Sequence, residues 1–313
     1  MALLFLAAPG FAMNFDGAKA QPEWVGIIEG LRPKPPRAAA SQASPSAVIV
    51  ASPGAAVVSP EALFEKLAAS DIVFVGEQHD QPRHHLLQLE VLKRTHAKTL
   101  AMEMLDITQQ AQLDDFLTGK TSEAEFETLW RKAWGYPWAI YKPIFDYAKE
   151  NHIRGKALNA PIAVVRQIAK GGLSSLTPEQ RKILPAEVNP IKDPRYLEFV
   201  KKSLGGHGPV DPVREARMLE AMAAWNETMG QSLIDAAKDG GPVVVIAGSG
   251  HMFYDAGILE SVRSRGALKQ TVVLPYSLDG EELPLDDLLA ALQKPGSEDL
   301  PLGDYFWLLP KAP

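Results

Sequence analysis

The chain has 313 residues, enough for one large domain with a proper hydrophobic core. Hydrophobic residues make up 46% and charged residues 22%, which excludes wholesale disorder, a collagen-like repeat and a polytopic membrane protein. The net charge of -6 lacks the electrostatic footprint of a nucleic-acid-binding protein, and the absence of cysteine excludes disulfides, a thiol nucleophile and cysteine-ligated metals.

The N-terminal residues have the character of an export signal rather than of a folded domain. Residues 2–13 are apolar but too short to span a bilayer, and Ala18-Lys19-Ala20 offers a small-x-small cleavage site. We therefore expect a signal segment over 1–20, a Pro/Ala-rich linker over 21–46 and a single domain over 47–313. The protein is expected to be exported, periplasmic or peripheral to the envelope, with no transmembrane segment.

The first elements of the domain are small. Val48–Val50 and Val57-Val58 flank the turn residues Ser52-Pro53-Gly54, a pattern that predicts a hairpin. Ser59-Pro60-Glu61 then combines an N-cap, a first-turn proline and an early acid, which predicts a helix running to about Ala69.

Five short apolar runs follow, separated by helical patterns. The runs are Ile72–Val75, Thr99–Met104, Gly155–Leu158, Val243–Ala247 and Thr271–Leu274. Apolar runs without alternation are typical of strands buried on both faces of a parallel sheet. We therefore expect an α/β fold with a mostly parallel central sheet flanked by helices, to which Asp304–Leu309 adds an edge strand.

The helical patterns predict more than simple crossovers between these strands. Leu86, Leu89 and Leu92 form one apolar stripe on the helix after the first run. The intervals 106–150 and 161–238 are mostly helical and longer than a crossover needs. They are expected to form insertions that build a helical cap at one end of the sheet.

Ionisable and polar side chains follow the ends of four predicted strands. The set is Glu77, His79, His84, His85, Glu103, Asn159 and His251. Because ligands bind beyond the carboxyl ends of the strands in open α/β sheets, these side chains are expected to share a site. His79 and His251 each stand in a Gly-x-x-His motif, and histidines with carboxylates suit a divalent metal. The alternative is that each histidine is an ordinary hydrogen-bonded loop residue.

Aromatic residues provide two further candidates. Trp130, Trp134, Tyr136, Trp138 and Tyr141 form either a packed helical cap or a wall for a flat apolar ligand. Tyr254, three residues after the second Gly-x-x-His motif, is either a hydrogen-bonding partner of the site or a haem-iron ligand of the catalase type.

Six motifs, in order, resemble those of one known family. They are Gly76-Glu77-Gln78-His79, His84-His85 with Gln88-Leu89, Ala101-Met102-Glu103-Met104, Ala157-Leu158-Asn159-Ala160-Pro161, Trp225-Asn226-Glu227-Thr228-Met229 and Gly248-Ser249-Gly250-His251. Over about residues 46–280 the chain resembles the ChaN-like haem-binding proteins. These are grouped with the Tiki/TraB and erythromycin-esterase-like proteins in one superfamily.

The resemblance implies an α/β core with a helical cap and a role in bacterial iron or haem uptake at the cell envelope. It implies haem bound through a tyrosine, with paired haems between the two subunits of a homodimer. Tyr254 is the expected ligand because it lies beside the second Gly-x-x-His motif, with Tyr136 and Tyr141 as alternatives. His84 and His85 complete the expected cofactor-binding set. The family is often lipid-anchored through a cysteine, which this chain lacks.

The Tiki-type relatives imply a different function, that of a divalent-metal-dependent hydrolase of peptide or ester bonds. Carried over to this chain, the catalytic residues are Glu77, His79, Glu103 and His251. His79, Glu103 and His251 would hold the metal ion, which lowers the pKa of bound water, and Glu77 would take a proton from that water. Whether Glu77 is a ligand, a base or a partner that orients His79 stays open at this point.

Overall fold

The computed structural model describes residues 48–52, 56–205, 211–278 and 302–309. The expected signal segment (1–20) and linker (21–46) lie outside the described residues, so both stay predictions, as does export. Within the described ranges, none of the helices combines the length and the hydropathy that a membrane span needs.

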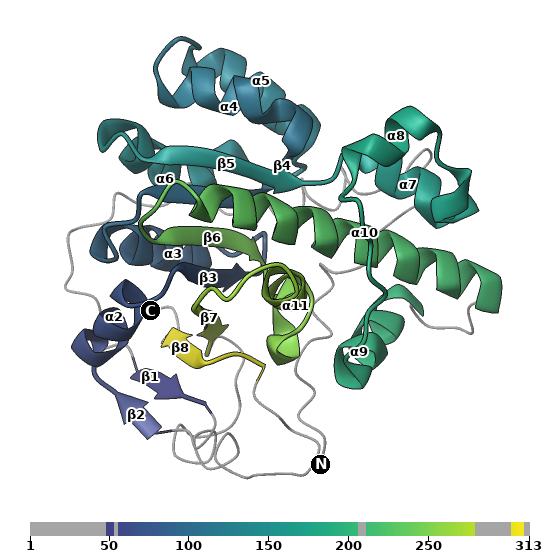
Figure 1. Cartoon of the computed structure of the whole chain (residues 1–313). Helices are drawn as coiled ribbons and strands as arrows, with labels where there is room; N and C mark the ends of the chain where they lie inside the picture. Colours follow the sequence, from purple (N-terminus) through teal and green to yellow (C-terminus); the bar gives the residue numbers. More distant parts are fainter. Residues whose placement is uncertain (1–47, 53–55, 206–210, 279–301, 310–313) are drawn as a thin grey trace, which may run out of the picture.

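One sheet runs through the described part of the chain, with eight strands in the order β2-β1-β8-β7-β3-β6-β4-β5 (Figure 1). The strands are β1 (Val48–Ala51), β2 (Ala56–Val58), β3 (Ile72–Glu77), β4 (Thr99–Asp106), β5 (Arg154–Asn159), β6 (Val243–Gly248), β7 (Gln270–Ser277) and β8 (Tyr305–Leu309). Every neighbouring pair from β8 to β5 is parallel, and β1 is antiparallel to both β2 and β8. The expected α/β fold with a mostly parallel sheet is confirmed.

Helices cover both faces of this sheet. They are α2 (Pro60–Ala68), α3 (Pro82–Arg94), α4 (Gln110–Leu117), α5 (Glu123–Ala133), α6 (Trp138–Glu150), α7 (Ile162–Gly171), α8 (Pro178–Ile183), α9 (Pro194–Gly205), α10 (Pro212–Ala237) and α11 (Ile258–Arg263). Val73 and Val75 of β3 pack in one apolar cluster with α2, α3, α5 and α6. Ile72 and Phe74 pack in a second cluster with α9, α10 and α11. The alternation of side chains along a strand thus gives β3 two buried faces.

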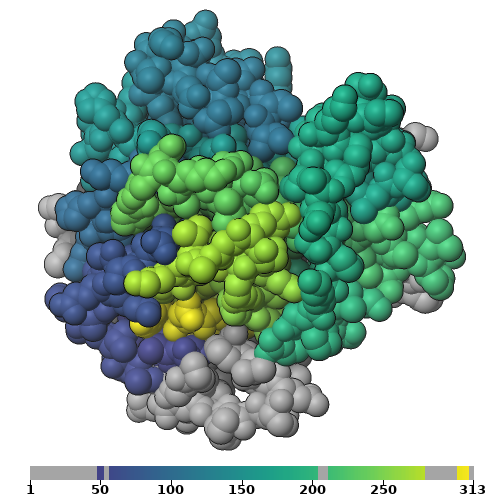
Figure 2. All heavy atoms as spheres, in the orientation of Figure 1, coloured from purple at the N-terminus to yellow at the C-terminus, as the bar shows by residue number. Residues whose placement is uncertain are grey.

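The two long helical intervals supply different parts of the molecule. The first forms α4, α5 and α6, and the connection between α5 and α6 places Trp134 and Tyr136 against His79 at the carboxyl edge of the sheet. The second forms α7 to α10, and α7 packs against α10 beyond the end of β5 (Figure 1). In the same orientation, Figure 2 shows α4 and α5 at the top and α7 to α9 at the right of the molecule.

Two local expectations are corrected by tertiary contacts. The strand expected at an edge over 304–309 is β8, which lies between β7 and β1, so β2 and β5 form the edges instead. The stripe expected on α3 is also wrong in part, because Leu86 is 58% exposed. The buried face of α3 carries His85 and Gln88 as well as leucines and valine, since it packs beside a buried carboxylate described below.

Candidate functional site

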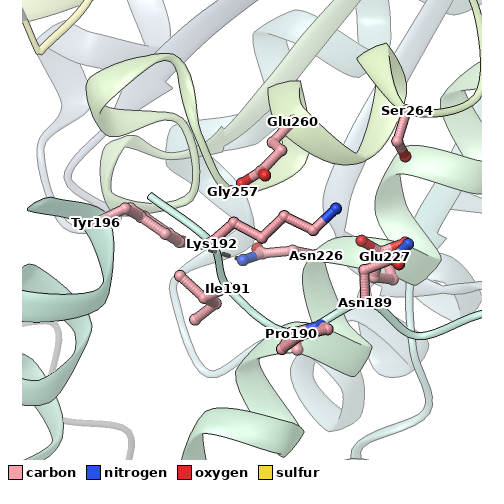
Figure 3. Close-up of a pocket in the computed structure, with 11 residues that line it drawn as sticks. Asn189, Pro190, Ile191, Lys192, Tyr196, Asn226, Glu227, Gly257, Glu260 and Ser264 are labelled. Carbon is pink, nitrogen blue, oxygen red and sulfur yellow. Dashed lines mark hydrogen bonds between the residues drawn. The ribbon is translucent and has the colours of Figure 1, made fainter. Parts of the chain in front are cut away.

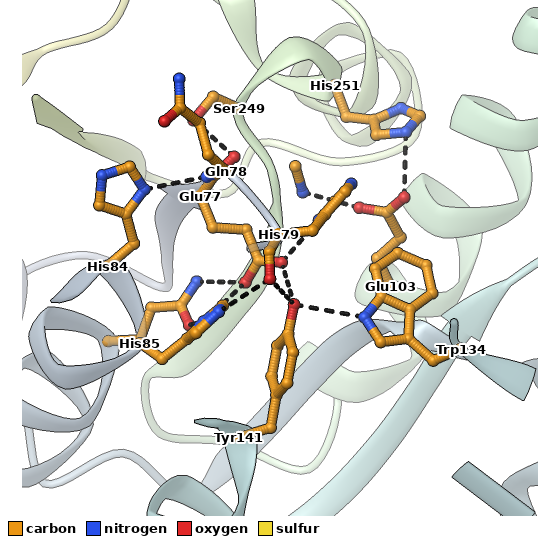
Figure 4. A network of polar contacts seen from close by, with 12 residues as sticks. Glu77, Gln78, His79, His84, His85, Glu103, Trp134, Tyr141, Ser249 and His251 are labelled. Carbon is orange, nitrogen blue, oxygen red and sulfur yellow. Dashed lines mark hydrogen bonds and ion pairs between the residues drawn. The ribbon is translucent and has the colours of Figure 1, made fainter. Parts of the chain in front are cut away.

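Three adjacent strands deliver the central carboxylates and histidines to one edge of the sheet. In the order β3-β6-β4, Glu77 ends β3, His251 follows β6 in a short 3₁₀ turn, and Glu103 of β4 comes directly after Met102, the last β4 residue paired with β6. Figure 4 shows these side chains converging with His79, which follows β3. The parallel sheet brings together the four residues expected at the shared site, although they lie up to 174 positions apart in the sequence (77 to 251).

Glu77 is the hub of the network. Its Oε1 accepts hydrogen bonds from Nδ1 of His79 at 2.7 Å and from the hydroxyl of Tyr141 at 2.6 Å. Its Oε2 accepts from Nε2 of Gln88 at 2.8 Å and lies 3.4 Å from Nδ1 of His85. Burial raises the pKa of Glu77, but the hydrogen bonds from His79 and His85 outweigh it and hold this pKa far below its usual range. Glu77 is therefore a buried anion.

His85 is the cation that balances this charge. Its Nε2 lies 3.1 Å from the carbonyl oxygen of His79, and its Nδ1 lies 3.1 Å from Oε1 of Gln88. The amide of Gln88 is oriented by its Nε2, which donates to Glu77 and to the carbonyl of Val75. Both ring nitrogens of His85 thus face oxygen acceptors, so both carry a hydrogen. Burial lowers the pKa of His85, but the contact with Glu77 outweighs it and raises this pKa overall.

His79 is the site histidine that retains access to solvent, with 13% of its side chain exposed. Its ring lies edge-on to Trp134 at 4.8 Å and beside Tyr136 at 5.1 Å, measured between ring centroids. A Cβ on Gly248 would lie 2.8 Å from Cε1 of His79, so this approach of ring to backbone requires glycine. Burial lowers the pKa of His79, and the hydrogen bond to Glu77 overcomes this and raises it.

Glu103 is the second buried carboxylate of the site, and it contacts His251. Its Oε2 accepts from the backbone N–H of Gly248 at 2.7 Å, and its Oε1 lies 3.3 Å from Nε2 of His251. Burial raises the pKa of Glu103, but the charge of His251 outweighs it and lowers the pKa overall. On its far side, Nδ1 of His251 lies 2.8 Å from Oδ1 of Asn226. The ring of Trp225 stands edge-on to His251 at 5.5 Å.

His84 stands apart from the charged network. Its Nδ1 accepts a hydrogen bond from the backbone N–H of Gln78 at 2.9 Å. Nε2 therefore carries the hydrogen of a neutral ring, and this buried atom has no hydrogen-bond partner among the described residues. Burial lowers the pKa of His84 to about 4. At 2% exposure the ring is closed off from a ligand as large as haem.

The three tyrosines named as haem ligands lie in different surroundings. Tyr141 is fully buried, and burial together with the charge of Glu77 raises its pKa well above the usual value. Tyr136 is half-buried beside His79, and burial raises its pKa as well. Tyr254 is half-buried in the turn after His251, with a left-handed backbone (φ 61°) and its ring 5.5 Å from the guanidinium of Arg195. The structure thus places Tyr141 and Tyr136 at the acid–histidine network and Tyr254 beside Arg195.

Three contributors to the site had no assigned role in the sequence-based prediction. Gln88 and Asn226 occur in the motifs of the resemblance, but only packing shows that their amides hold His85 and His251. Tyr196, which contacts Asn226, lies outside every motif. A polar residue on the buried face of a helix was the available signal for Gln88 and Asn226.

The expected metal ligands do not meet at one point. Among the described residues, no three His, Asp or Glu side chains are grouped so that they could hold a metal ion. Glu103 contacts His251 directly, and His79 is turned toward Glu77 through Nδ1. The donors present therefore do not fit a three-ligand metal centre in this arrangement.

The fold and the site define a class of protein: an α/β protein with a buried acid–histidine network at the carboxyl edge of a parallel sheet. A family model described as haem-binding uptake, Tiki superfamily, ChaN matches residues 63–262, more than half of the 313-residue chain. The chain belongs to this family, so the suspected resemblance is confirmed, and haem binding is the function of the family.

The chain is similar to several known proteins. ChaN of Campylobacter jejuni, solved with cofacial haem, matches with a TM-score of 0.60 and 16% identity over 83% of this chain and 96% of that one. A mutant erythromycin esterase in its open conformation matches with a TM-score of 0.42 and 12% identity, over 70% of this chain and 73% of that chain. Protein RETICULATA-RELATED 5, chloroplastic, of Arabidopsis thaliana is 25% identical over 284 residues. That match covers 83% of this chain and 37% of the plant protein, so the chain spans little more than a third of that relative's length.

Proposed function

We propose that this chain binds haem in bacterial iron or haem uptake, with Tyr254 as the ligand of the iron. Family membership supports haem as the cofactor. The surroundings of the tyrosines support Tyr254. The hydroxyl of Tyr141 donates to Glu77 inside the core, and burial raises the pKa of Tyr136, which disfavours the anionic phenolate that binds ferric iron. Tyr254 is half-buried and lies beside Arg195 rather than against the buried carboxylates.

Titration of the full chain with haemin, followed by visible absorption, tests this proposal. A saturable Soret shift at one haem per chain is expected, together with a high-spin ferric spectrum that Tyr254→Phe abolishes. Tyr136→Phe is the matched control, since it removes a half-buried phenol next to His79 and should leave the spectrum intact. Unchanged binding by Tyr254→Phe would remove Tyr254 as the ligand, and a flat titration of the unaltered chain would remove haem binding.

Two finer expectations accompany haem binding. We propose that paired haems join two copies of the chain, so light scattering should show a doubling of mass on addition of haemin. We also propose export, which the apolar stretch over 2–13 and the small residues Ala18 and Ala20 support. N-terminal sequencing of the mature protein from a periplasmic fraction tests export, and a full-length chain in the cytoplasm would contradict it.

A second function, hydrolysis, is supported by the ionised groups buried at the sheet edge. Buried anions cost free energy, and groups with perturbed pKa values gather at sites of chemistry. Because the expected ligands do not fit a metal centre, we propose no step through a metal. His79 is the better candidate base, since Glu77 already accepts three hydrogen bonds and its pKa is far too low for it to take up a proton. Glu77 then orients His79.

In this reaction His79 takes a proton from water at Nε2 while the water oxygen attacks an ester or peptide carbonyl. The C–O or C–N bond of the tetrahedral intermediate then breaks, and His79 returns the proton from Nε2 to the leaving alcohol or amine. The contact with Glu77 raises the pKa of His79, so its unprotonated form accumulates only above the ordinary value near 6.5, and the rate should rise through neutral pH. An ester and peptide library tests this with His79→Gln against His96→Gln, a histidine on the exposed surface. Equal turnover by the two variants, or none by the unaltered chain, would end the hydrolase proposal.

A further inference from the structure

A buried hydrogen-bonded chain runs behind His251, away from Glu103. Nδ2 of Asn226 donates to the hydroxyl oxygen of Tyr196 at 3.1 Å, and Oδ1 of Asn226 lies 2.8 Å from Nδ1 of His251. Figure 3 shows the contact between Asn226 and Tyr196, and Figure 4 shows His251 with its other nitrogen toward Glu103. Tyr196, Asn226 and His251 are 0%, 3% and 2% exposed, so all three side chains are buried.

The amide orientation decides that Nδ1 of His251 carries a hydrogen. Because Nδ2 of Asn226 is used on Tyr196, its carbonyl oxygen faces His251, and a carbonyl oxygen can only accept. Nδ1 of His251 must therefore be the donor. Its Nε2 is then the nitrogen directed at Glu103, 3.3 Å from Oε1 of that carboxylate.

The surrounding backbone is built to allow this arrangement. Gly257 has a φ of 60°, and a Cβ at this position would lie 2.2 Å from the carbonyl oxygen of His251 and 2.9 Å from the hydroxyl of Tyr196. Only glycine lets the start of α11 come this close. A cavity of about 20 Å³, room for about one water, is lined by Asn226 and Tyr196 together with Glu227 and Glu260 (Figure 3).

We propose that Asn226, held by Tyr196, is a positioning residue that keeps Nδ1 of His251 protonated as a donor to its amide oxygen and so directs Nε2 at Glu103. Asn226 acts on His251 and contacts no substrate. The role goes beyond both proposed functions, since it concerns the state of His251 whether the chain carries haem or hydrolyses an ester.

Long-range ¹H–¹⁵N correlation on the ¹⁵N-histidine-labelled full chain reads the two ring nitrogens directly. His251→Gln identifies the signals of His251 by their loss. In the unaltered chain, Nδ1 of His251 is expected at the chemical shift of a protonated nitrogen. An unprotonated Nδ1 would overturn the proposal without any further variant. This holds whatever the results of the haem titration and the hydrolysis assay.

Three variants then test what fixes this state. Asn226→Ala removes the acceptor of Nδ1, so the Nδ1 signal should shift toward the position of an unprotonated nitrogen. Tyr196→Phe should shift the signals in the same direction by a smaller amount, because the amide remains but loses its partner. Asn151→Ala, at the exposed end of α6, is the matched control and should leave His251 unchanged. If Asn226→Ala folds and leaves the His251 signals in place, or fails to fold while Tyr196→Phe leaves them in place, Asn226 does not position His251.

Discussion

Replacing His84 by Asn should remove one well-defined step from the acid unfolding of this protein. Burial, aided by the positive charges of His85 and Arg83 and opposed by Glu77, lowers the pKa of His84 from its ordinary 6.5 to about 4. A histidine with a lowered pKa contributes stability above pH 6.5 that is lost as the pH falls, because the unfolded chain takes up the proton first. Between these two pKa values the free energy of unfolding falls by about 1.36 kcal/mol per pH unit. The fall begins near pH 6.5, so between pH 7 and pH 4.5 it amounts to about 2.5 kcal/mol.

Asparagine suits the test because its Oδ1 can replace Nδ1 of His84 as the acceptor for the backbone N–H of Gln78. Urea unfolding at pH 7, 6, 5 and 4.5 gives the free energy of unfolding of both proteins. Its decrease from pH 7 to pH 4.5 should be about 2.5 kcal/mol smaller in His84→Asn than in the unaltered chain. Burial raises the pKa values of Glu260 and Asp304, so these two groups add stability as the pH falls. Their effect is the same in both proteins and cancels when the two are compared.

The pH window separates His84 from the charged network. The lowered pKa values of Glu77 and Glu103 give stability that is lost only as the pH falls below about 4.5. The raised pKa values of His79 and His85 give stability that is lost only as the pH rises above about 6.5. His96→Asn is the control, since the same substitution there removes an exposed histidine whose positive φ of 49° asparagine tolerates. Equal pH dependence in His84→Asn and the unaltered chain would refute the assignment of this step to His84.

Three other substitutions probe the structure that carries the site. Tyr141→Phe removes a hydrogen bond to the buried Glu77 carboxylate and should cost about 1.5–3 kcal/mol in urea unfolding, with the far-UV circular dichroism unchanged. Gln110→Ala removes the side-chain amide that pairs with the backbone of the edge strand β5, so hydrogen exchange at the N–H of Ala157 should speed up and stability should fall by about 1–2 kcal/mol. Gly257→Ala should lose about 2–4 kcal/mol because its Cβ would overlap the backbone of the neighbouring turn, and a thermal unfolding curve equal to that of the unaltered chain would contradict this.

The strands and their common edge could be predicted because each depends on local composition and one topological rule. Apolar runs such as Val243–Ala247 have no alternation, and in the structure β6 is buried along its whole length. Parallel strands end at the same edge, which is why Glu77 and Glu103 could be expected at one edge of the sheet without a structure, although β6 lies between their strands. The prediction needed no knowledge of which strand lies next to which.

The partners of these side chains could not be predicted, because they depend on tertiary packing. The leucine stripe on α3 indicated an ordinary apolar face, but the helix is rotated so that His85 and Gln88 face the carboxylate and Leu86 faces solvent. The sequence likewise gives no signal that β8 inserts between β7 and β1, since a short apolar run has the same pattern at an edge or inside a sheet.

The arrangement of charges explains why the two proposed functions can be tested separately. Glu77 is neutralised inside the core by His85 and bonded by Tyr141, so its network is held by α3 and α6 on one face of the sheet. Tyr254 lies beside Arg195 of α9, and its neighbour Phe253 packs in the cluster on the other face. A substitution on one face therefore alters different contacts from a substitution on the other, and effects of groups that share no partner usually add. If Tyr254→Phe loses haem binding but keeps the pH dependence of unfolding, Tyr254 is the haem ligand. If it loses haem binding and the pH dependence of unfolding together, the substitution has disrupted the fold.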